Sequence, residues 1–233
     1  MSDYSRSRID LRTWVAMAML TAVAYVVMYL SKMLPSVNGF LDFDFKDVVI
    51  CISGFIYGPL PAAIISIVVA LIEAVTISHT GPIGLLMNVL ATCSFCCTAT
   101  FVYKRNHTMK GAVVGLSLGV ISLVVVMLLW NYLITPVYQK IPREVVAAML
   151  PTVFLPFNLA KGGMNMAATL LLYKPVVTAL RKARLAPESR APKSTATLNG
   201  EPVRAKVNVG FLLFSLALLA TFVALALVLW GVI

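Results

Sequence analysis

The sequence has few charged residues, and this scarcity excludes an ordinary soluble domain. Only 12% of its 233 residues are Asp, Glu, Lys or Arg, while 60% are hydrophobic. Soluble domains carry about 25% charged residues. We therefore expect an integral membrane protein whose core contains no soluble domain.

Cysteine and histidine are also scarce, which argues against a metal site and against disulfides. The chain has four cysteines and two histidines. The cysteines are Cys51, Cys93, Cys96 and Cys97, all inside apolar runs. Cys93 and Cys96 have a C-x-x-C spacing, but a metal site would need further ligands at the same depth. We expect small buried side chains here, with no disulfide, no metal and no cofactor.

A catalytic set is missing as well. A membrane enzyme would need a metal cluster or an acid, a base and a nucleophile at one depth, and Glu73, His79 and Lys161 are too sparse to form one. The sequence contains no G-x-x-x-x-G-K-[ST] phosphate-binding loop, so the chain is not expected to hydrolyse ATP itself. These absences predict that the protein is not an enzyme.

Long apolar runs dominate the chain instead. A helix needs about 20 apolar residues to cross a bilayer, so each long run is a candidate span. The runs occupy residues 12–31, 48–58, 60–78, 83–103, 112–134, 151–173 and 208–232. The second and third are separated only by the break at residues 58–61 (GPLP), which predicts a helical hairpin.

These runs predict an all-α membrane protein with six core helices and one extra C-terminal transmembrane helix. The expected parts are a cytoplasmic N-terminal tail (1–11), a six-helix membrane domain (12–180), a basic cytoplasmic linker (181–207) and an accessory transmembrane helix (208–233). The linker is rich in Pro, Ser, Thr, Ala and basic residues, which is typical of a flexible segment.

The net charge of +10 is distributed in a way that indicates orientation and not nucleic-acid binding. With a cytoplasmic N-terminus, fourteen Lys and Arg residues fall in inside segments and four in outside segments. This asymmetry is the positive-inside rule. It predicts a cytoplasmic N-terminus, and a C-terminus outside if the last helix spans.

One lysine stands at membrane depth. Lys161 lies in residues 156–163 (PFNLAKGG), with apolar residues on both sides. An ammonium at this depth costs roughly 2.5–3.5 kcal/mol, so it usually faces a partner or a wet cavity. Asn158 lies three residues earlier, on the same helical face. This pair is the first candidate for a binding site.

Other polar and aromatic residues are expected near the same, outer membrane face. Residues 130–138 combine Trp and Tyr, which mark the interface, with Asn131. Pro151 and Pro156 would loosen the helix backbone at this depth. Aromatic rings can stack on the faces of a flat ligand, and amides can hydrogen-bond to its edges. These residues therefore predict a site for a flat, heteroatom-rich organic molecule.

Three features leave alternatives open. Residues 40–45 (FLDFDF) alternate aromatic and acidic side chains, so this loop is either a lid over a cavity or an interfacial anchor. Glu73 is either functional, as in a proton-coupled carrier, or a structural counter-ion. The small residues Ala18 and Ala22 either pack inside the bundle or face a partner helix, whereas Gly111, Gly115 and Gly119 favour packing inside it.

Residues 131–138 (NYLITPVY) and 156–162 (PFNLAKG) resemble the riboflavin-specific S components of bacterial energy-coupling factor (ECF) vitamin transporters. The loop at 40–43 and the hairpin at 54–59 (GFIYGP) match in kind and order. The resemblance covers roughly residues 12–178, and residues 186–233 have no counterpart in it.

This resemblance implies a six-helix S-component bundle in the bacterial cell membrane that captures riboflavin from outside with high affinity. It implies that Leu41, Asn131, Asn158 and Lys161 hold the flavin by hydrogen bonds. Further candidate contacts are Phe40, Phe43, Tyr132, Phe157 and Glu73. Ala18 and Ala22 would face the transmembrane T component, and two cytoplasmic ATPases would supply energy. The alternative is an S component or a stand-alone carrier for another small polar solute.

Overall fold

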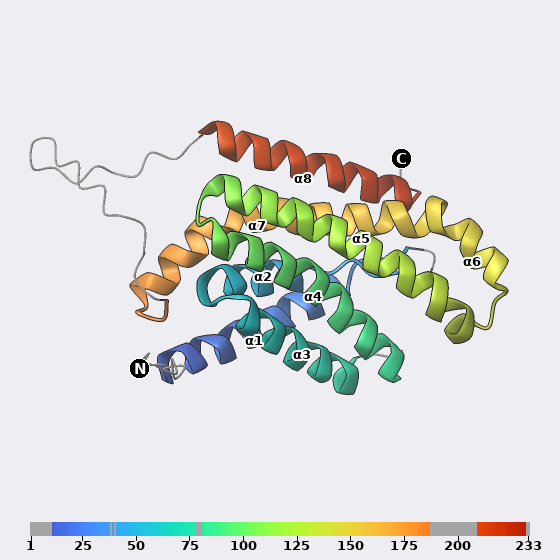
Figure 1. Cartoon of the computed structure of the whole chain (residues 1–233), viewed down its shortest axis with the longest axis horizontal. Coiled ribbons are helices and arrows are strands. Elements are labelled where there is room, and N and C mark those ends of the chain that lie inside the picture. Colours follow the sequence, from blue (N-terminus) through green and yellow to red (C-terminus); the bar gives the residue numbers. More distant parts are fainter. Residues whose placement is uncertain (1–10, 38, 40, 78–80, 187–208, 232–233) are drawn as a thin grey trace, which may run out of the picture.

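The computed structural model describes residues 11–37, 39, 41–77, 81–186 and 209–231. These residues form α1 (Leu11–Ser31), α2 (Lys46–Tyr57), α3 (Pro59–Thr76), α4 (Gly81–Arg105), α5 (Met109–Gln139), α6 (Arg143–Met149), the π-helix η1 (Leu150–Phe154), α7 (Leu155–Lys182) and α8 (Val209–Leu229). The predicted all-α bundle is confirmed (Figure 1). Phe40, His79 and most of the predicted tail and linker lie outside the described residues.

Most helices are long and apolar enough to cross a bilayer. Six stretches qualify, namely α1, α3, α4, α5, the continuous α6–η1–α7 unit and α8. The exception is α2, whose 12 residues span only about 18 Å against a hydrocarbon core of about 30 Å. It lies inside the bundle in contact with α1, α3, α4 and α7, so its short length is compatible with a membrane setting.

The predicted hairpin between α2 and α3 is confirmed. α2 ends at Tyr57 and α3 begins at Pro59, with Gly58 between them at φ 104°. A residue with a side chain rarely adopts this conformation, and proline is favoured in the first turn of a helix. The turn therefore follows from the residues at the break.

Glycines allow α4 and α5 to pack closely, as the sequence predicted. A Cβ on Gly115 would lie 2.6 Å from the Ala99 carbonyl oxygen, and one on Gly119 would lie 2.7 Å from that of Phe95. Such distances are too short for a side chain. Gly115 and Gly119 thus form an intramolecular contact between α4 and α5.

The sixth predicted span is longer than its apolar run. The helical segment begins at Arg143 and continues to Lys182, well beyond residues 151–173. Both of its ends carry charged residues, so a search for apolar runs does not include them. Pro151 lies within the π-helix η1 and Pro156 in the first turn of α7. Proline lacks the N–H needed for a regular helix, which explains the wide turn here.

The cysteines sit as expected for packing residues. All four are free thiols, with Cys51 and Cys96 buried and Cys93 and Cys97 half-buried. Cys51 and Cys96 belong to the apolar core formed by α1 to α5 and α7. Cys93 Sγ donates to Ser66 Oγ and Cys97 Sγ donates to the Pro59 carbonyl, each at 3.7 Å.

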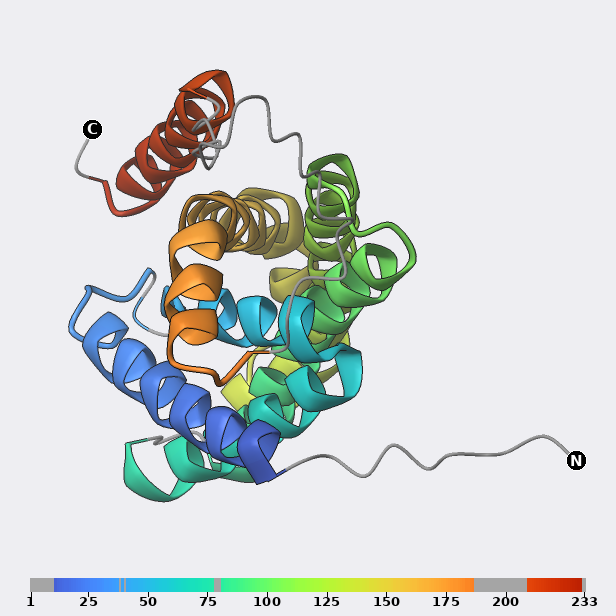
Figure 2. The same ribbon diagram turned by 90° about the vertical axis from the view of Figure 1, so that its left-hand side faces the viewer.

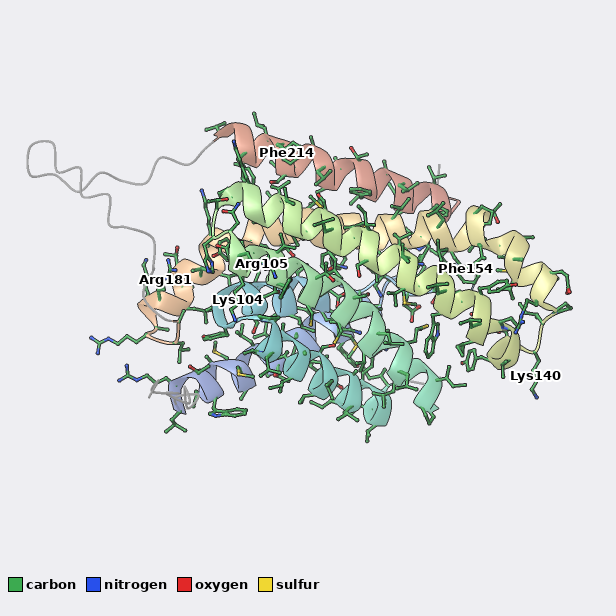
Figure 3. The ribbon with its side chains drawn as sticks, viewed as in Figure 1. Lys104, Arg105, Lys140, Phe154, Arg181 and Phe214 are labelled. Atoms are coloured by element: carbon green, nitrogen blue, oxygen red, sulfur yellow. The ribbon has the colours of Figure 1, made fainter. Side chains whose placement is uncertain are left out.

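The two ends of the bundle differ in charge. Lys104, Arg105 and Arg181 gather at one end, and Lys140 lies at the other (Figure 3). In the turned view, α8 and α1 lie on opposite sides of the bundle (Figure 2). The basic end is the one that the positive-inside rule predicts to be cytoplasmic.

Candidate ligand-binding cavity

A cavity of about 490 Å³ opens at the end of the bundle away from the basic end, a size typical of small-molecule sites. Its walls come from α3, α4, α5, α7 and the first loop, meaning the described residues 32–37, 39 and 41–45. Its polar side chains include Lys32, Asp42, Asp44, Glu73, Asn88, Asn131, Asn158 and Lys161. Its aromatic side chains are Trp130, Tyr138 and Phe157.

The structure brings most of the expected ligand contacts together in this cavity. Leu41, Glu73, Asn131, Phe157, Asn158 and Lys161 all line it. Two expected contacts, Phe43 and Tyr132, are not among the described residues that line it. Phe43 is 1% exposed and packs against Phe157, with ring centroids 4.8 Å apart. Tyr132 lies at the surface beneath the Arg143 guanidinium.

The two asparagine amides are held in place by their own helices. Asn131 Nδ2 donates to the Met127 carbonyl at 2.7 Å, and its Oδ1 accepts from Thr135 at 2.9 Å. Asn158 Nδ2 donates in the same way to the Phe154 carbonyl at 2.7 Å. An amide has two donor hydrogens, so each Nδ2 keeps a second donor beyond this bond. The amides are therefore pre-oriented before a ligand arrives.

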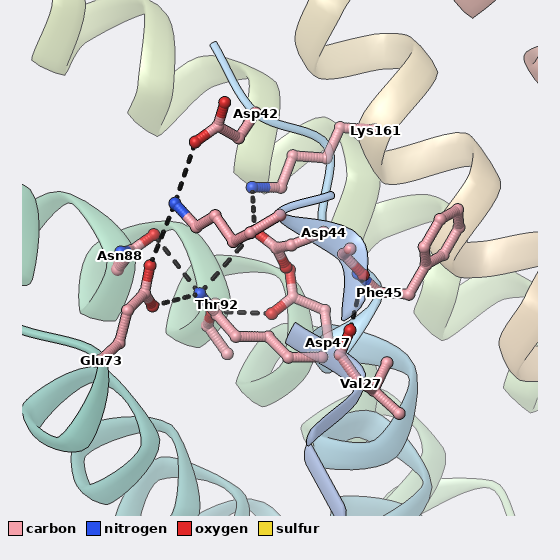
Figure 4. Close-up of polar contacts among 12 residues, drawn as sticks. Val27, Asp42, Asp44, Phe45, Asp47, Glu73, Asn88, Thr92 and Lys161 are labelled. Carbon is pink, nitrogen blue, oxygen red and sulfur yellow. Dashed lines mark hydrogen bonds and ion pairs between the residues drawn. The ribbon is translucent and has the colours of Figure 1, made fainter. Parts of the chain in front are cut away.

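Lys161 has a charged partner that the sequence reasoning missed. Its Nζ lies 2.7 Å from Asp44 Oδ2, and both side chains are almost fully buried (Figure 4). A buried charge is tolerated when it is paired in this way. The free-energy cost of placing Lys161 at membrane depth already indicated that it needs a partner. Asp44, an acidic residue of the alternating segment 40–45, is that partner.

Lys46 and Glu73 extend this pair into a buried ionic network. Figure 4 labels Glu73 and Asp44 of this network. Lys46 Nζ lies 3.1 Å from Glu73 Oε2 and 3.7 Å from Asp44 Oδ2. It also donates to Asn88 Oδ1 at 3.4 Å. Lys46 is one of the four basic residues predicted to lie in outside segments, but its side chain is only 2% exposed. Lys46 is therefore a buried counter-ion of two residues that line the cavity, Asp44 and Glu73.

Glu73 is a counter-ion for two lysines. Besides Lys46, it lies 3.3 Å from Lys32 Nζ through Oε1. Each carboxylate oxygen of Glu73 is thus paired with a lysine, which supports the interpretation of Glu73 as a structural counter-ion.

The first loop carries a second ion pair at the rim. Lys32 Nζ donates to Asp42 Oδ2 at 2.9 Å, and Ser36 donates to Asp42 Oδ1 at 2.6 Å. Burial lowers the pKa of Lys32, but Asp42 and Glu73 raise it more, so it lies above its usual value. Burial raises the pKa of Asp42, but Ser36 and Lys32 lower it more, so it lies below. Both groups are therefore charged at neutral pH.

Asn165 joins the first loop to α7. Its Nδ2 donates to the main-chain carbonyl of Asp44 at 3.0 Å and to that of Lys161 at 3.1 Å. Asn165 is 1% exposed. This amide thus fixes the backbone on both sides of the buried Lys161–Asp44 pair.

A bundle of membrane-spanning helices with a polar and aromatic cavity at one end defines a membrane protein that binds a small molecule. The matching family model narrows this class. Its description is "ECF transporter, substrate-specific component", and it matches residues 12–173. The chain belongs to this family.

Relatives agree with that assignment. The riboflavin transporter RibU of Staphylococcus aureus (strain TCH60) is 28% identical over 174 residues, which are 72% of this chain and 92% of the relative. The riboflavin transporter FmnP of Bacillus subtilis (strain 168) is 29% identical over 64% of this chain and 83% of its own length. RibU of Streptococcus thermophilus (strain ATCC BAA-250 / LMG 18311) is 30% identical over 71% and 82%.

A solved structure shares the fold. The S component of a bacterial ECF transporter superposes with a TM-score of 0.62 at 27% identity, covering 73% of this chain and 98% of its own. The family match ends at residue 173, before α8 begins at Val209. The cavity therefore belongs to the shared core, and α8 is an addition to it.

Proposed function

We propose that this protein is the riboflavin-binding subunit of an ECF-type uptake transporter. The observation that carries this proposal is the cavity itself, where the side chains of Asn131, Asn158 and Lys161 meet the rings of Trp130 and Phe157. Riboflavin has a flat ring system with a polar pyrimidine edge and a hydroxylated ribityl chain. The names of the three relatives support the same ligand.

Recognition would use fixed amides at the polar edges of the vitamin. Asn131 and Asn158 can each donate and accept, which suits the alternating donors and acceptors of a pyrimidine edge and of hydroxyl groups. Leu41, from the first loop, lines the cavity and would add an apolar contact. An analogue that lacks one polar group would leave a buried amide unpaired, and this penalty would provide selectivity.

Lys161 can serve the ligand and the protein together. An ammonium group has three donor hydrogens, and one of them is used by Asp44. The others are available to a flavin carbonyl or a ribityl hydroxyl. The carboxylate holds the ammonium in place, so little side-chain entropy is lost when the ligand binds.

The proposed assembly includes a T component and two ATPases, with capture of riboflavin at the outer face. Ala18 and Ala22 both lie on the exposed side of α1, whereas Met17 and Leu20 face the core. Small residues on an exposed helix face allow a second helix to approach closely. This placement supports α1 as the contact with the T component.

An absorption spectrum of the purified protein tests the proposal. The chain is overproduced in bacteria grown with riboflavin, purified in detergent and scanned through the visible range. A yellow preparation with close to one flavin per chain supports the proposal. A colourless preparation that also leaves the fluorescence of added riboflavin unquenched would overturn it.

A further inference from the structure

The C-terminal helix α8 packs along α7 with one defined face. Ser215 and Ala226 are buried, whereas Leu213, Phe214 and Val228 are at least half exposed. A helix that only anchored the chain in lipid would not need a buried face. α8 therefore packs at a specific position on the bundle, although it lies outside the part of the chain that the family model matches.

A glycine of α7 allows α8 to pack closely against it. Gly163 lies directly beneath the ring of Phe222, and a Cβ at this position would overlap that ring. Phe222 and its neighbours on α8 join the apolar cluster that contains Phe154 and Phe157. The close approach shows that the sequence of α7 accommodates α8.

Trp230, just after the end of α8, reaches the first loop. Its Nε1 donates to the main-chain carbonyl of Pro35 at 2.9 Å. Its ring stands edge-on to Phe43, with centroids 5.4 Å apart and planes at 87°. Phe43 in turn packs against Phe157, a cavity residue. One side chain thus contacts the first loop at two points.

The first loop has little regular structure, so contacts from other elements hold it in place: Lys161 and Asn165 of α7 bind Asp44, and Trp230 binds Pro35. Among its described residues, the β-type pairing is the isolated bridge in which the Val37 and Leu41 N–H groups donate to one another's carbonyls at 2.8 and 3.0 Å, and the N–H groups of residues 32–34 donate back to the last turn of α1. Loops with few internal hydrogen bonds open at low free-energy cost. Yet Leu41, Asp42 and Asp44 of this loop line the cavity.

We propose that α8 holds the first loop against the cavity, with Trp230 as the positioning residue, so that bound riboflavin leaves slowly. The ligand in this statement rests on the proposed function. α8 is fixed to α7 at Gly163, and Trp230 connects that fixed point to Pro35 and Phe43. Opening the loop breaks both Trp230 contacts, so they add to the barrier for release.

Two Trp230 variants and one control test this proposal in the full-length protein. Trp230→Ala removes the hydrogen bond and the ring contact, and Trp230→Phe removes the N–H donor and the larger indole but keeps an aromatic ring at this position. Phe214→Ala is the control, because it truncates an aromatic on the exposed face of the same helix. The measurements are the riboflavin dissociation rate, the melting temperature, and amide hydrogen exchange of the peptide containing Leu41 in flavin-free protein.

We expect riboflavin to dissociate about tenfold faster from Trp230→Ala, which loses both weak contacts, and about threefold faster from Trp230→Phe, which keeps a ring contact. Exchange at Leu41 should accelerate in Trp230→Ala, and Phe214→Ala should match wild type in both. Unchanged exchange and dissociation in Trp230→Ala, or equal changes in Phe214→Ala, would overturn the proposal. Because the exchange measurement uses no flavin, it decides the role of α8 even if riboflavin proves to be the wrong ligand.

Discussion

Two asparagines on neighbouring helices, α5 and α7, present their amides to one cavity, and each is anchored by a bond to its own helix. Replacing Asn158 or Asn131 by alanine should weaken riboflavin binding roughly tenfold, because each change removes a buried hydrogen-bonding group at a polar edge. Fluorescence quenching of riboflavin by the purified variants measures the effect.

Tyr132 provides the matched control for Asn131. It is adjacent in sequence but lies at the surface, away from the cavity. Tyr132→Ala should bind riboflavin as wild type does. Equal losses in Tyr132→Ala and Asn131→Ala would show that the outer end of α5 matters as a whole and that the amide is not a specific contact.

The Lys161–Asp44 pair predicts a non-additive effect on stability. Lys161→Met removes the nearest cation of Asp44 and leaves Lys46 at 3.7 Å, and breaking a buried pair costs about 3–5 kcal/mol. The double variant Asp44→Asn with Lys161→Met removes both charges, so it should unfold closer to wild type than Lys161→Met does. Thermal unfolding of flavin-free protein in detergent makes the comparison, and simply additive losses would contradict a direct pair.

At the level of residues, the sequence predicted polar groups better than it predicted their partners. Asn131, Asn158 and Lys161 are recognisable because polar side chains are rare in apolar runs. Asp44 and Lys46 were not recognised as members of the site, because charges in a loop usually face solvent. Only the fold shows that the end of this loop and the start of α2 lie inside the bundle, where Asp44 and Lys46 are buried.

Among the helices, the contact between α4 and α5 is set by glycine. Gly119→Ala should lower stability by about 1–3 kcal/mol, because the added methyl group meets the Phe95 carbonyl. Leu118→Ala is the control, since its side chain lies on the exposed face of the same helix. Thermal unfolding of both variants compares them, and equal losses would mean that close packing at Gly119 is unimportant.

The exposed face of α1 should matter for transport and not for binding. Ala18→Leu with Ala22→Leu should block riboflavin uptake in cells that also contain the T component and ATPases, because bulky side chains prevent close helix approach. Binding to the purified variant should equal that of wild type. Val26→Leu, also exposed on α1, serves as the control. Normal uptake by the double variant would exclude this face as the contact.

The elements themselves were largely predictable from apolar runs and breaking residues. Gly58 and Pro59 identified the hairpin, and Pro151 and Pro156 identified the irregular start of α7. The helical extension from Arg143 was missed because it begins with two charged residues, Arg143 and Glu144. Hydropathy identifies residues that can lie in the lipid, and it does not detect a helix that continues outside the membrane.

For the whole molecule, family membership extends over the six core helices and their cavity, and α8 is a separate addition. The sequence predicted α8 as a helix, but a nearly pure apolar composition gives no information about which face is buried. Its seat on Gly163 and the reach of Trp230 to the first loop depend on tertiary structure. This is why its role was not predictable from the residues alone.

A fluorescence titration of flavin-free protein with riboflavin tests the central claim most directly. The protein is stripped of flavin, and riboflavin is added in steps while its emission is followed. We predict saturable quenching with one riboflavin per chain, and a roughly tenfold weaker curve for Asn158→Ala. Quenching that does not saturate, or that is identical in wild type and in the Asn158→Ala and Asn131→Ala variants, would contradict riboflavin binding in this cavity.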